Sequence, residues 1–385
     1  MIDTVALMID SKLFVNFSKD GFFKQVTLSG NKTFTKYLRN PSEKEKQKFG
    51  YLPRLTLLNR GITEEMVKIE FSAPKLIFNN NFDELEEKDF DLVISTLYQK
   101  LKDMGCGIFS RFLTEAPVSL IHYSKNIPFT DGSMPYMYLK EIQKANITQR
   151  LDFNQTDFRN EGHSLKFRAN SFEVAFYDKV KDLEKAKISE KRAVEKDNTI
   201  QLSLFDDIQR YRKQKSFEIL RMEVRLNQRQ KIRQVLRKIG QEVEPTFQNL
   251  FKKEIAKKVL LYHLDQIEDG YPKLLYFQLK SAKDFLAQFV IDNPKAKIKD
   301  PFTALGFYQA LEETNTREVR ELLKKHPKNS WYRFFRQIDN FSYPKNALPI
   351  FEPIRNSITK SKPFKLFDFK DKMINNDKYT KLITK

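Results

Sequence analysis

The sequence contains only one cysteine, Cys106. One thiol cannot build a disulfide framework or a zinc site with several cysteine ligands, and such low cysteine usage fits a reducing compartment. Long apolar runs are also lacking, since no window approaches the roughly 18 uncharged apolar residues of a membrane-spanning helix. The start, MIDTVALMID, has no basic segment and includes Asp3 and Asp10, so it predicts a β-strand rather than a signal peptide. We therefore expect a soluble, cytoplasmic protein with no membrane partner.

Positive charge is what the sequence has in excess. Its 385 residues include 69 lysines and arginines against 50 acidic residues, a formal charge of +19. With 40% hydrophobic residues, among them 34 phenylalanines, the chain can still bury cores. The excess is concentrated in residues 207–240, where eleven basic residues oppose three acidic ones, a net charge of +8. Clustered lysine and arginine predict a nucleic-acid partner, with acidic proteins and anionic lipid as alternatives.

Strand-like segments dominate the first part of the chain and helical patterns the second. The predicted strands are 4–9, 51–58, 66–71, 118–123, 165–177 and 219–226. The predicted helices are 89–104, 135–145, 229–239, 245–267, 282–291, 301–311, 316–325 and 331–337. This order predicts an α+β fold: an antiparallel sheet domain with flanking helices (1–228), a helical DNA-binding domain (229–345) and a basic, loosely held tail (346–385). The charge-dense stretch 185–216 is predicted to be an insertion or surface excursion of the first domain.

Four of the predicted strands carry polar side chains at alternate positions. Because successive side chains of a strand point to opposite faces, each set shares one face. The sets are Lys68 and Glu70; His122 and Ser124; Arg221, Glu223 and Arg225; and Glu173, Tyr177 and Lys179. A solvated sheet face explains any one of these sets about as well as a functional site does. Four such strands together favour a polar site on one face of the sheet.

Several short motifs, in order, resemble a known family. They are the MID start, IEFSAPKLI at 69–77, LIHYSKN at 120–126, FYDK at 176–179, LRMEVRL at 220–226 and PKNSWYRFF at 327–335. Together they resemble the phage and plasmid replication initiators of the filamentous-phage gene II/gene X family, which are related to the HUH endonucleases. The resemblance implies an HUH-like nicking domain, acting in a bacterial host cell on the single- and double-stranded DNA of a replication origin.

The resemblance also implies the chemistry of the site. Tyr177 would be the nucleophile and Lys179 its partner in a Tyr-x-Lys motif, and the product would be a 5′-phosphotyrosine with a free 3′-hydroxyl. A Mg²⁺ or Mn²⁺ ion would polarise the scissile phosphate. This chain departs from the family's His-hydrophobic-His pair, because it has His122-Tyr123-Ser124. We therefore expect His122 to be joined as metal ligand by Glu70 and Glu223, with His163 as a weaker candidate and a structural role as the alternative for His122.

Arginines and lysines near this site are the predicted DNA contacts. Arg221 and Arg225 either hold DNA phosphates or pair with Glu70 and Glu223. The helix 229–239 has an apolar stripe and a basic face, so it is the predicted DNA-contact helix. Its DNA-facing residues are Arg229, Arg233, Arg237 and Lys238. The aromatic run 331–335 either stacks on bases or, as is common for aromatic residues in helices, belongs to a core.

One further motif lies in the charged excursion. Residues 201–205, QLSLF, resemble the short peptide by which bacterial replication proteins dock on the DNA-polymerase sliding clamp. Gln201, Leu202, Leu204 and Phe205 would make the contact, with Leu204 and Phe205 as apolar anchors. The alternative is a chance pentapeptide packed on its own domain. A host helicase is a further expected partner.

The function expected from these features is initiation of rolling-circle replication by nicking and rejoining one DNA strand. Two alternatives share part of the sequence pattern. A protein that binds single-stranded DNA and regulates replication without cutting would not need Tyr177, whereas a mobilisation relaxase would use the same chemistry for DNA transfer.

Overall fold

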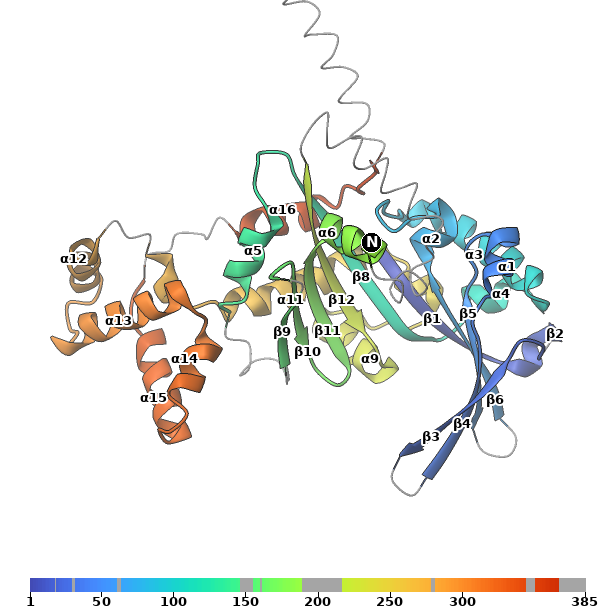
Figure 1. The fold of residues 1–385 in the computed structure, drawn as a ribbon, viewed down its shortest axis with the longest axis horizontal. Coiled ribbons are helices and arrows are strands. Elements are labelled where there is room, and N and C mark those ends of the chain that lie inside the picture. The colour runs from blue at the N-terminus through green and yellow to red at the C-terminus, as the bar shows by residue number, and fades with distance from the viewer. Residues whose placement is uncertain are drawn as a thin grey trace, which may run out of the picture.

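The computed structural model describes residues 1–17, 19–29, 32–60, 64–145, 155–159, 161–188, 217–277, 281–343 and 350–366. Within them the chain forms an α+β protein, in which a large antiparallel sheet is followed by mostly helical sequence (Figure 1). The α+β prediction is confirmed.

Ten strands form the main sheet, in the order β3-β4-β5-β6-β1-β8-β12-β11-β10-β9. All neighbouring strands in it are antiparallel. The strands of the main sheet are β1 (Ile2–Asp10), β3 (Phe23–Ser29), β4 (Lys32–Arg39), β5 (Arg54–Arg60), β6 (Glu64–Ser72), β8 (Val118–Phe129), β9 (Gln155–Arg159), β10 (Ser164–Arg168), β11 (Phe172–Asp178) and β12 (Glu218–Leu226). A small second sheet pairs β2 (Phe14–Phe17) with β7 (Cys106–Ile108).

The helices of the first part of the chain flank this sheet. They are α1 (Glu43–Phe49), α2 (Ala73–Phe78), α3 (Phe90–Asp103), α4 (Ser110–Thr114), α5 (Pro135–Ile142) and α6 (Lys179–Ile188). After β12 follow α9 (Arg229–Lys238), α10 (Phe247–Leu250), α11 (Lys253–Asp269), α12 (Ala282–Asp292), α13 (Lys299–Glu313), α14 (Thr316–Leu322), α15 (Lys328–Asp339) and α16 (Phe351–Lys360). Short 3₁₀ turns occur at Ser11–Leu13, Glu87–Asp89 and Lys273–Tyr276.

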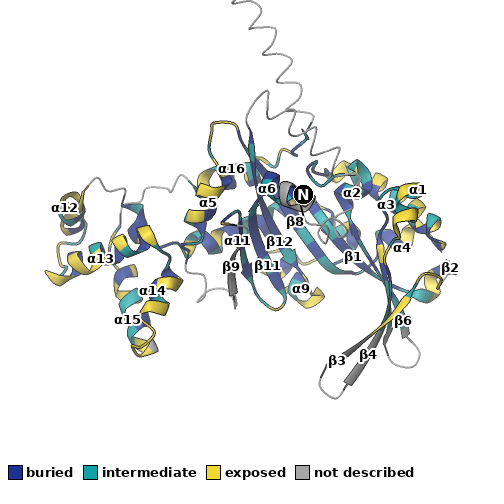
Figure 2. Cartoon of the chain, viewed as in Figure 1, coloured by how far each residue is buried: buried dark blue, intermediate teal, exposed yellow. Residues whose placement is uncertain are grey.

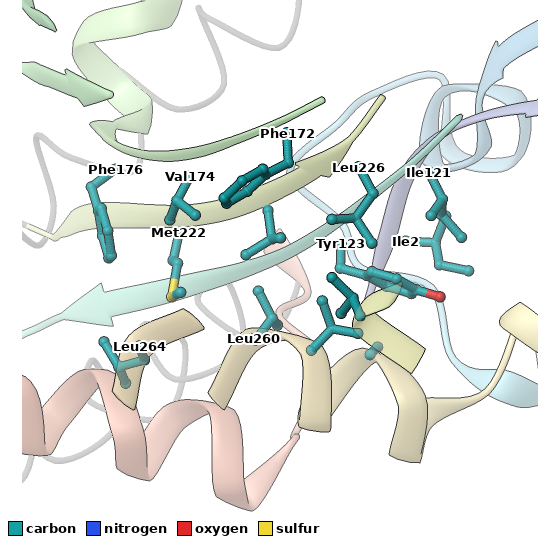
Figure 3. Close-up of a cluster of buried hydrophobic side chains, with 14 of the residues drawn as sticks. Ile2, Ile121, Tyr123, Phe172, Val174, Phe176, Met222, Leu226, Leu260 and Leu264 are labelled. Carbon is teal, nitrogen blue, oxygen red and sulfur yellow. The ribbon is translucent and has the colours of Figure 1, made fainter. Parts of the chain in front are cut away.

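The central strands bury one face against helices. Phe172, Val174 and Phe176 alternate along β11 and are buried, and Met222 and Val224 do the same on β12. These side chains meet Leu260 and Leu264 of α11 (Figure 3). The alternation in the sequence therefore predicts the buried face correctly, because every second residue is apolar. The face that packs against α11 is called the helix face below, and the opposite face the polar face.

The helices that follow β12 lie in two places. α9, α11 and α16 pack directly on β8 or β12, whereas α12 to α15 stand apart at one end of the molecule (Figure 1). Figure 2 shows buried residues along the central strands and exposed positions spread over α12 to α15. In that outer group Phe307 of α13 contacts Trp331, Phe334 and Phe335 of α15. The aromatic run 331–335 thus contributes to a local core.

The stretch from residue 346, expected to be a loose tail, contains ordered structure where it is described. Phe351, Ile354 and Ile358 of α16 are buried. Residues 361–366, named the strap here, then cross to the N-terminal part of the chain. Phe364 is buried with Phe82, Val180, Leu183, Phe217 and Ile219 in a cluster of its own. The strap connects sequence positions almost 300 residues apart, which no local pattern indicates.

One strand prediction is wrong, and several strands of the structure, among them β2, β7 and β9, were not predicted. The predicted strand 165–177 is a hairpin of β10 and β11, turned at residues 169–171. The β3–β4 hairpin, which extends away from the body in Figure 1, was not predicted.

Candidate metal centre

Strand register gathers the polar side chains of three strands, β8, β12 and β11, on one face. Arg225 of β12 lies opposite His122 of β8 and Glu173 of β11, and Arg221 lies opposite Tyr177. Glu223, between the two arginines on the same face, is flanked by Ser124 of β8. Because β8, β12 and β11 are adjacent, these residues form one continuous polar group on the sheet.

A β-bulge adds an acidic residue that the sequence analysis did not assign. Ile2 of β1 pairs with Tyr123, and Val5 pairs with Ile121, so β1 has one extra residue in this step. Ile2 and Val5 are both buried. The bulge therefore turns Asp3 to the polar face, which is the usual effect of an extra residue in one strand.

Asp3, His122 and Glu223 together have the donor types of a metal site. One ligand atom from each can be chosen so that all three lie within 4.8 Å of one another. Nδ1 of His122 is 3.3 Å from Oε1 of Glu223. Oδ1 of Asp3 is buried without a hydrogen-bond partner among the described residues, although it lies 3.1 Å from the Arg221 guanidinium. Two carboxylates and an imidazole are donor types that could hold a divalent metal ion.

Glu223 is the centre of the group. Its oxygens accept hydrogen bonds from Nε and a terminal nitrogen of Arg225, both at 3.1 Å, and from the Tyr177 hydroxyl at 3.1 Å. Burial alone would raise the pKa of its carboxyl, but Arg225, the His122 hydrogen bond and Arg221 hold that pKa well below the usual range. Glu223 is therefore an ionised acceptor at neutral pH.

Tyr177 is half-buried, and its hydroxyl donates to Glu223. Burial and then the Glu223 charge hold the pKa of the phenol well above its usual value, while Arg221 acts in the opposite direction. The phenol is therefore protonated, and its proton already points at a carboxylate. This arrangement suits proton transfer to Glu223 when the hydroxyl oxygen reacts.

The two arginines of β12 have different surroundings. Arg221 is only 2% exposed; it contacts Asp3 and donates to Ser124, Asn126 and the Asn81 carbonyl. Arg225 is partly exposed and also donates to Glu173 at 2.7 Å. Arg221 therefore acts as a structural cation within the group, and Arg225 has a second carboxylate to hold if Glu223 binds a metal.

Lys179 does not share a strand face with Tyr177. β11 ends at Asp178, whose carboxylate accepts from the amides of Val180 and Lys181 and so begins α6. The Lys179 ammonium is buried over the rings of Phe82 and Tyr177, 5.7 Å from the centre of the latter. The cation that counteracts the raised pKa of the Tyr177 phenol is instead Arg221. An aspartate immediately before the helix is the sequence signal for this change of structure.

Two expected ligands lie elsewhere. Glu70 is on β6, on the far side of β1, and pairs with Lys68 at 2.6 Å. His163 lies beside the start of β10, with Nδ1 3.5 Å from the Asp178 carboxylate and its ring against Tyr136. The described structure thus gathers His122 and Glu223 of the expected set, with Asp3 in place of Glu70.

The basic helix α9 lies on the other side of the sheet. Ile232, Val235 and Leu236 are its buried residues, and Lys231 lies 3.9 Å from the ring centre of Phe172 on the helix face. Arg229 and Arg233 reach Glu244, at 3.6 Å and 3.0 Å. Arg237 and Lys238 are near the exposed end of the helix. The basic stretch 207–240 is therefore divided between two faces wherever it is described.

The predicted clamp-binding residues Gln201, Leu202, Leu204 and Phe205 lie outside the described residues.

Comparison with known proteins gives no relative: no family model, curated protein or solved structure matches this chain. Among the described residues, no helix is both long and apolar enough to cross a membrane.

Proposed function

We propose that this protein is a metal-dependent enzyme that nicks and rejoins one strand of DNA through Tyr177, as an initiator of rolling-circle replication does. The observation that carries the proposal is the 3.1 Å hydrogen bond from the Tyr177 hydroxyl to Glu223, a carboxylate that also belongs to the Asp3–His122–Glu223 group. A protonated nucleophile, an ionised acceptor and three metal-type donors meet within one polar group.

In the proposed reaction the Tyr177 oxygen forms a bond to the phosphorus of a phosphodiester. The phenolic proton passes to Glu223, and the bond from phosphorus to the 3′-oxygen breaks, so that the 3′-end leaves as a hydroxyl after taking up a proton. The 5′-phosphate stays attached to Tyr177, which preserves the bond energy for rejoining. A metal held by Asp3, His122 and Glu223 would supply charge stabilisation at the phosphate.

Arg225 and Arg221 support the same chemistry. Glu173 is also paired with Arg168 at 3.0 Å and with Lys166 at 3.6 Å, so its charge does not depend on Arg225 alone. When Glu223 engages a metal, Arg225 retains its 2.7 Å bond to Glu173. Arg221 keeps Asp3 in place through their ion pair.

The test is covalent capture of DNA. A randomised pool of 40-nucleotide single strands, labelled at the 3′-end, is incubated with the protein and Mg²⁺ or Mn²⁺, and the label is followed on a denaturing protein gel. We expect an adduct that disappears with EDTA and in Tyr177→Phe and Glu223→Gln. Tyr136→Phe, which alters a partly exposed tyrosine on α5, is the matched control and retains the adduct.

An adduct that persists in Tyr177→Phe refutes the assigned nucleophile. Binding of the pool without any adduct, with either metal, refutes cutting and supports the non-cutting single-strand-binding function instead.

A further inference from the structure

A polar concavity lies beside the Asp3–His122–Glu223 group, and the proposed function does not use it. Its volume is about 380 Å³, within the range of ligand pockets, which is about 300–1,000 Å³. Its lining includes Thr4, Tyr51, Arg54, Glu70, Ser72 and Lys75. It is called the Tyr51 groove below. It lies over β1, β6 and β5, the strands that follow β8 across the sheet.

Strand β1 connects the groove to the Asp3–His122–Glu223 group. Thr4 lines the groove, and its hydroxyl is 3.5 Å from the Asp3 carboxylate. Thr4 pairs with Ser72 of β6, and Glu70 on the same strand pairs with Arg54 of β5. Because neighbouring strands are about 4.8 Å apart, β5 is only about 10 Å from β1. A strand of DNA at Asp3 therefore needs only one or two more nucleotides to enter the groove.

The side chains of the groove suit a phosphate. Arg54 is exposed at its wall, and Lys75 and Lys46 also line it. The two carboxylates present are already neutralised, Glu43 by Lys46 at 3.1 Å and Glu70 by Lys68 at 2.6 Å. The lining therefore carries three cations, Lys46, Arg54 and Lys75, against two carboxylates, which favours an anion.

Two further features favour a nucleotide over a bare anion. Oγ of Ser72 is buried without a hydrogen-bond partner among the described residues, which leaves a hydroxyl to be satisfied by a ligand. The Tyr51 ring is held in the wall because its hydroxyl accepts from the Ser72 amide at 2.6 Å, and Lys75 lies 5.8 Å from the ring centre. A fixed aromatic ring beside cations is the usual platform for a nucleic-acid base.

We infer that the Tyr51 groove binds the phosphate and base of a nucleotide that flanks the cleaved phosphodiester. Arg54 and Lys75 hold the phosphate, Ser72 donates to it and Tyr51 stacks on the base. This inference rests on the proposed function for the identity of the strand. DNA then runs across the polar face, from Tyr177 over the Asp3–His122–Glu223 group to β5.

The test measures DNA binding separately from cutting. Fluorescent (dT)₁₂ is titrated in EDTA with protein that carries Tyr177→Phe, so that no covalent step contributes. The double variant Arg54→Gln/Lys75→Gln should bind about tenfold more weakly. The slope of log K against log salt should fall by about 0.7 for each phosphate that the variant no longer neutralises. Tyr51→Ala should weaken binding about fivefold at every salt concentration, because stacking does not involve counterions.

The matched control is Lys44→Gln/Lys48→Gln, which removes the same charge from α1, next to the groove but outside its lining. A groove variant that binds within twofold of this control overturns the inference. Free dTMP should compete poorly, since a single nucleotide in the groove does not reach Asp3. If dTMP competes as well as (dT)₁₂, the site takes free nucleotides instead, and a DNA track is refuted.

The two proposals fail separately. If the groove variants lose (dT)₁₂ binding but the unmodified chain forms no adduct with the DNA pool, the groove stands and cutting fails. If adducts form at saturating DNA with equal efficiency and equal apparent affinity in the groove variants, cutting stands and the groove inference fails.

Discussion

Glu84 and Glu223 are both buried carboxylates with lowered pKa values, yet their surroundings differ in kind. Glu84 accepts from the backbone amides of Asn126 and Phe364 and from the Lys125 ammonium, at 2.5 to 3.0 Å. Among the described residues, the partners of the Glu223 carboxylate are the side chains of Arg225, Tyr177 and His122. Backbone donors cannot leave without unfolding, whereas side chains can turn to other partners.

Glu84 is positioned as a structural charge, and Glu223 as one that can bind a ligand. Glu84 joins the loop 79–86, β8 and the strap, and the same loop holds Arg221 through the Asn81 carbonyl. Glu223 is 2% exposed but is bordered by the half-buried His122 and Tyr177. A ligand can therefore replace partners around Glu223 but not around Glu84.

The largest expected difference is in the free energy of unfolding lost when the charge of Glu84 or of Glu223 is removed. Glu84→Gln should lower the free energy of unfolding by about 3–5 kcal/mol, because it leaves Lys125 buried without its carboxylate. Glu223→Gln should cost about 1–2 kcal/mol, since Arg225 retains Glu173. Urea denaturation followed by circular dichroism measures both losses. Glu86→Gln, which removes a more exposed carboxylate, is the control and should be near neutral. Equal losses for Glu84→Gln and Glu223→Gln would abolish the distinction.

The pH dependence of the free energy of unfolding can also be used to compare the two glutamates. The contribution of His263 must first be removed from it. Burial lowers the pKa of His263 to about 4, so between about pH 6.5 and 4 the unfolded chain binds a proton that the folded chain does not. Stability should therefore fall by about 3 kcal/mol as the pH drops through this range. Thermal unfolding of His263→Leu should lack this component. A variant as pH-dependent as the unmodified protein between pH 6.5 and 5 would contradict it.

Below about pH 4.5, Glu84 and Glu223 contribute to the remaining slope, as do Glu45, Glu87 and Asp131, whose pKa values are also lowered. Burial opposes ionisation of Glu84, but the chain's amino terminus and Lys125 hold its pKa below the usual value. For both Glu84 and Glu223 the stabilisation is complete above the ordinary carboxyl pKa near 4.5 and is lost as the pH falls through the lowered values.

Of the two compared glutamates, metal binding should involve Glu223 and not Glu84. With Mn²⁺ at ten times its dissociation constant, the free energy of unfolding should rise by about 1.4 kcal/mol. The rise should vanish in Glu223→Gln and with EDTA, and persist in Glu86→Gln. Thermal shift with and without Mn²⁺ measures it. Stabilisation that survives Glu223→Gln would place the ion elsewhere.

Much of the polar group could be predicted from the sequence, because strand alternation is a local property. Arg221, Glu223 and Arg225 fall on one face by their spacing alone, and His122 joins them because β8 and β12 are neighbours in the sheet. Helices α3, α9 and α12 were predicted within two residues at each end, since their apolar periodicity is clear.

What could not be predicted depends on irregularities and on distant contacts. Asp3 reaches the polar face only because of the bulge between Ile2 and Val5, which alternation cannot reveal. Glu70 has the right residue type and the right face, but strand order places β1 between it and β8. Lys179 would share the face of Tyr177 if β11 continued, but Asp178 begins a helix there.

The strap has a consequence for the order in which the protein matures during synthesis. N-terminal segments emerge from the ribosome first and begin to fold as they appear. Phe82, Phe217 and Ile219 cannot complete their cluster until Phe364 has emerged, because it fills the same core. Glu84 likewise waits for the Phe364 amide. A nascent or prematurely terminated chain can thus contain every strand of the sheet. The loop 79–86 beside Arg221 would still lack its contacts with the strap.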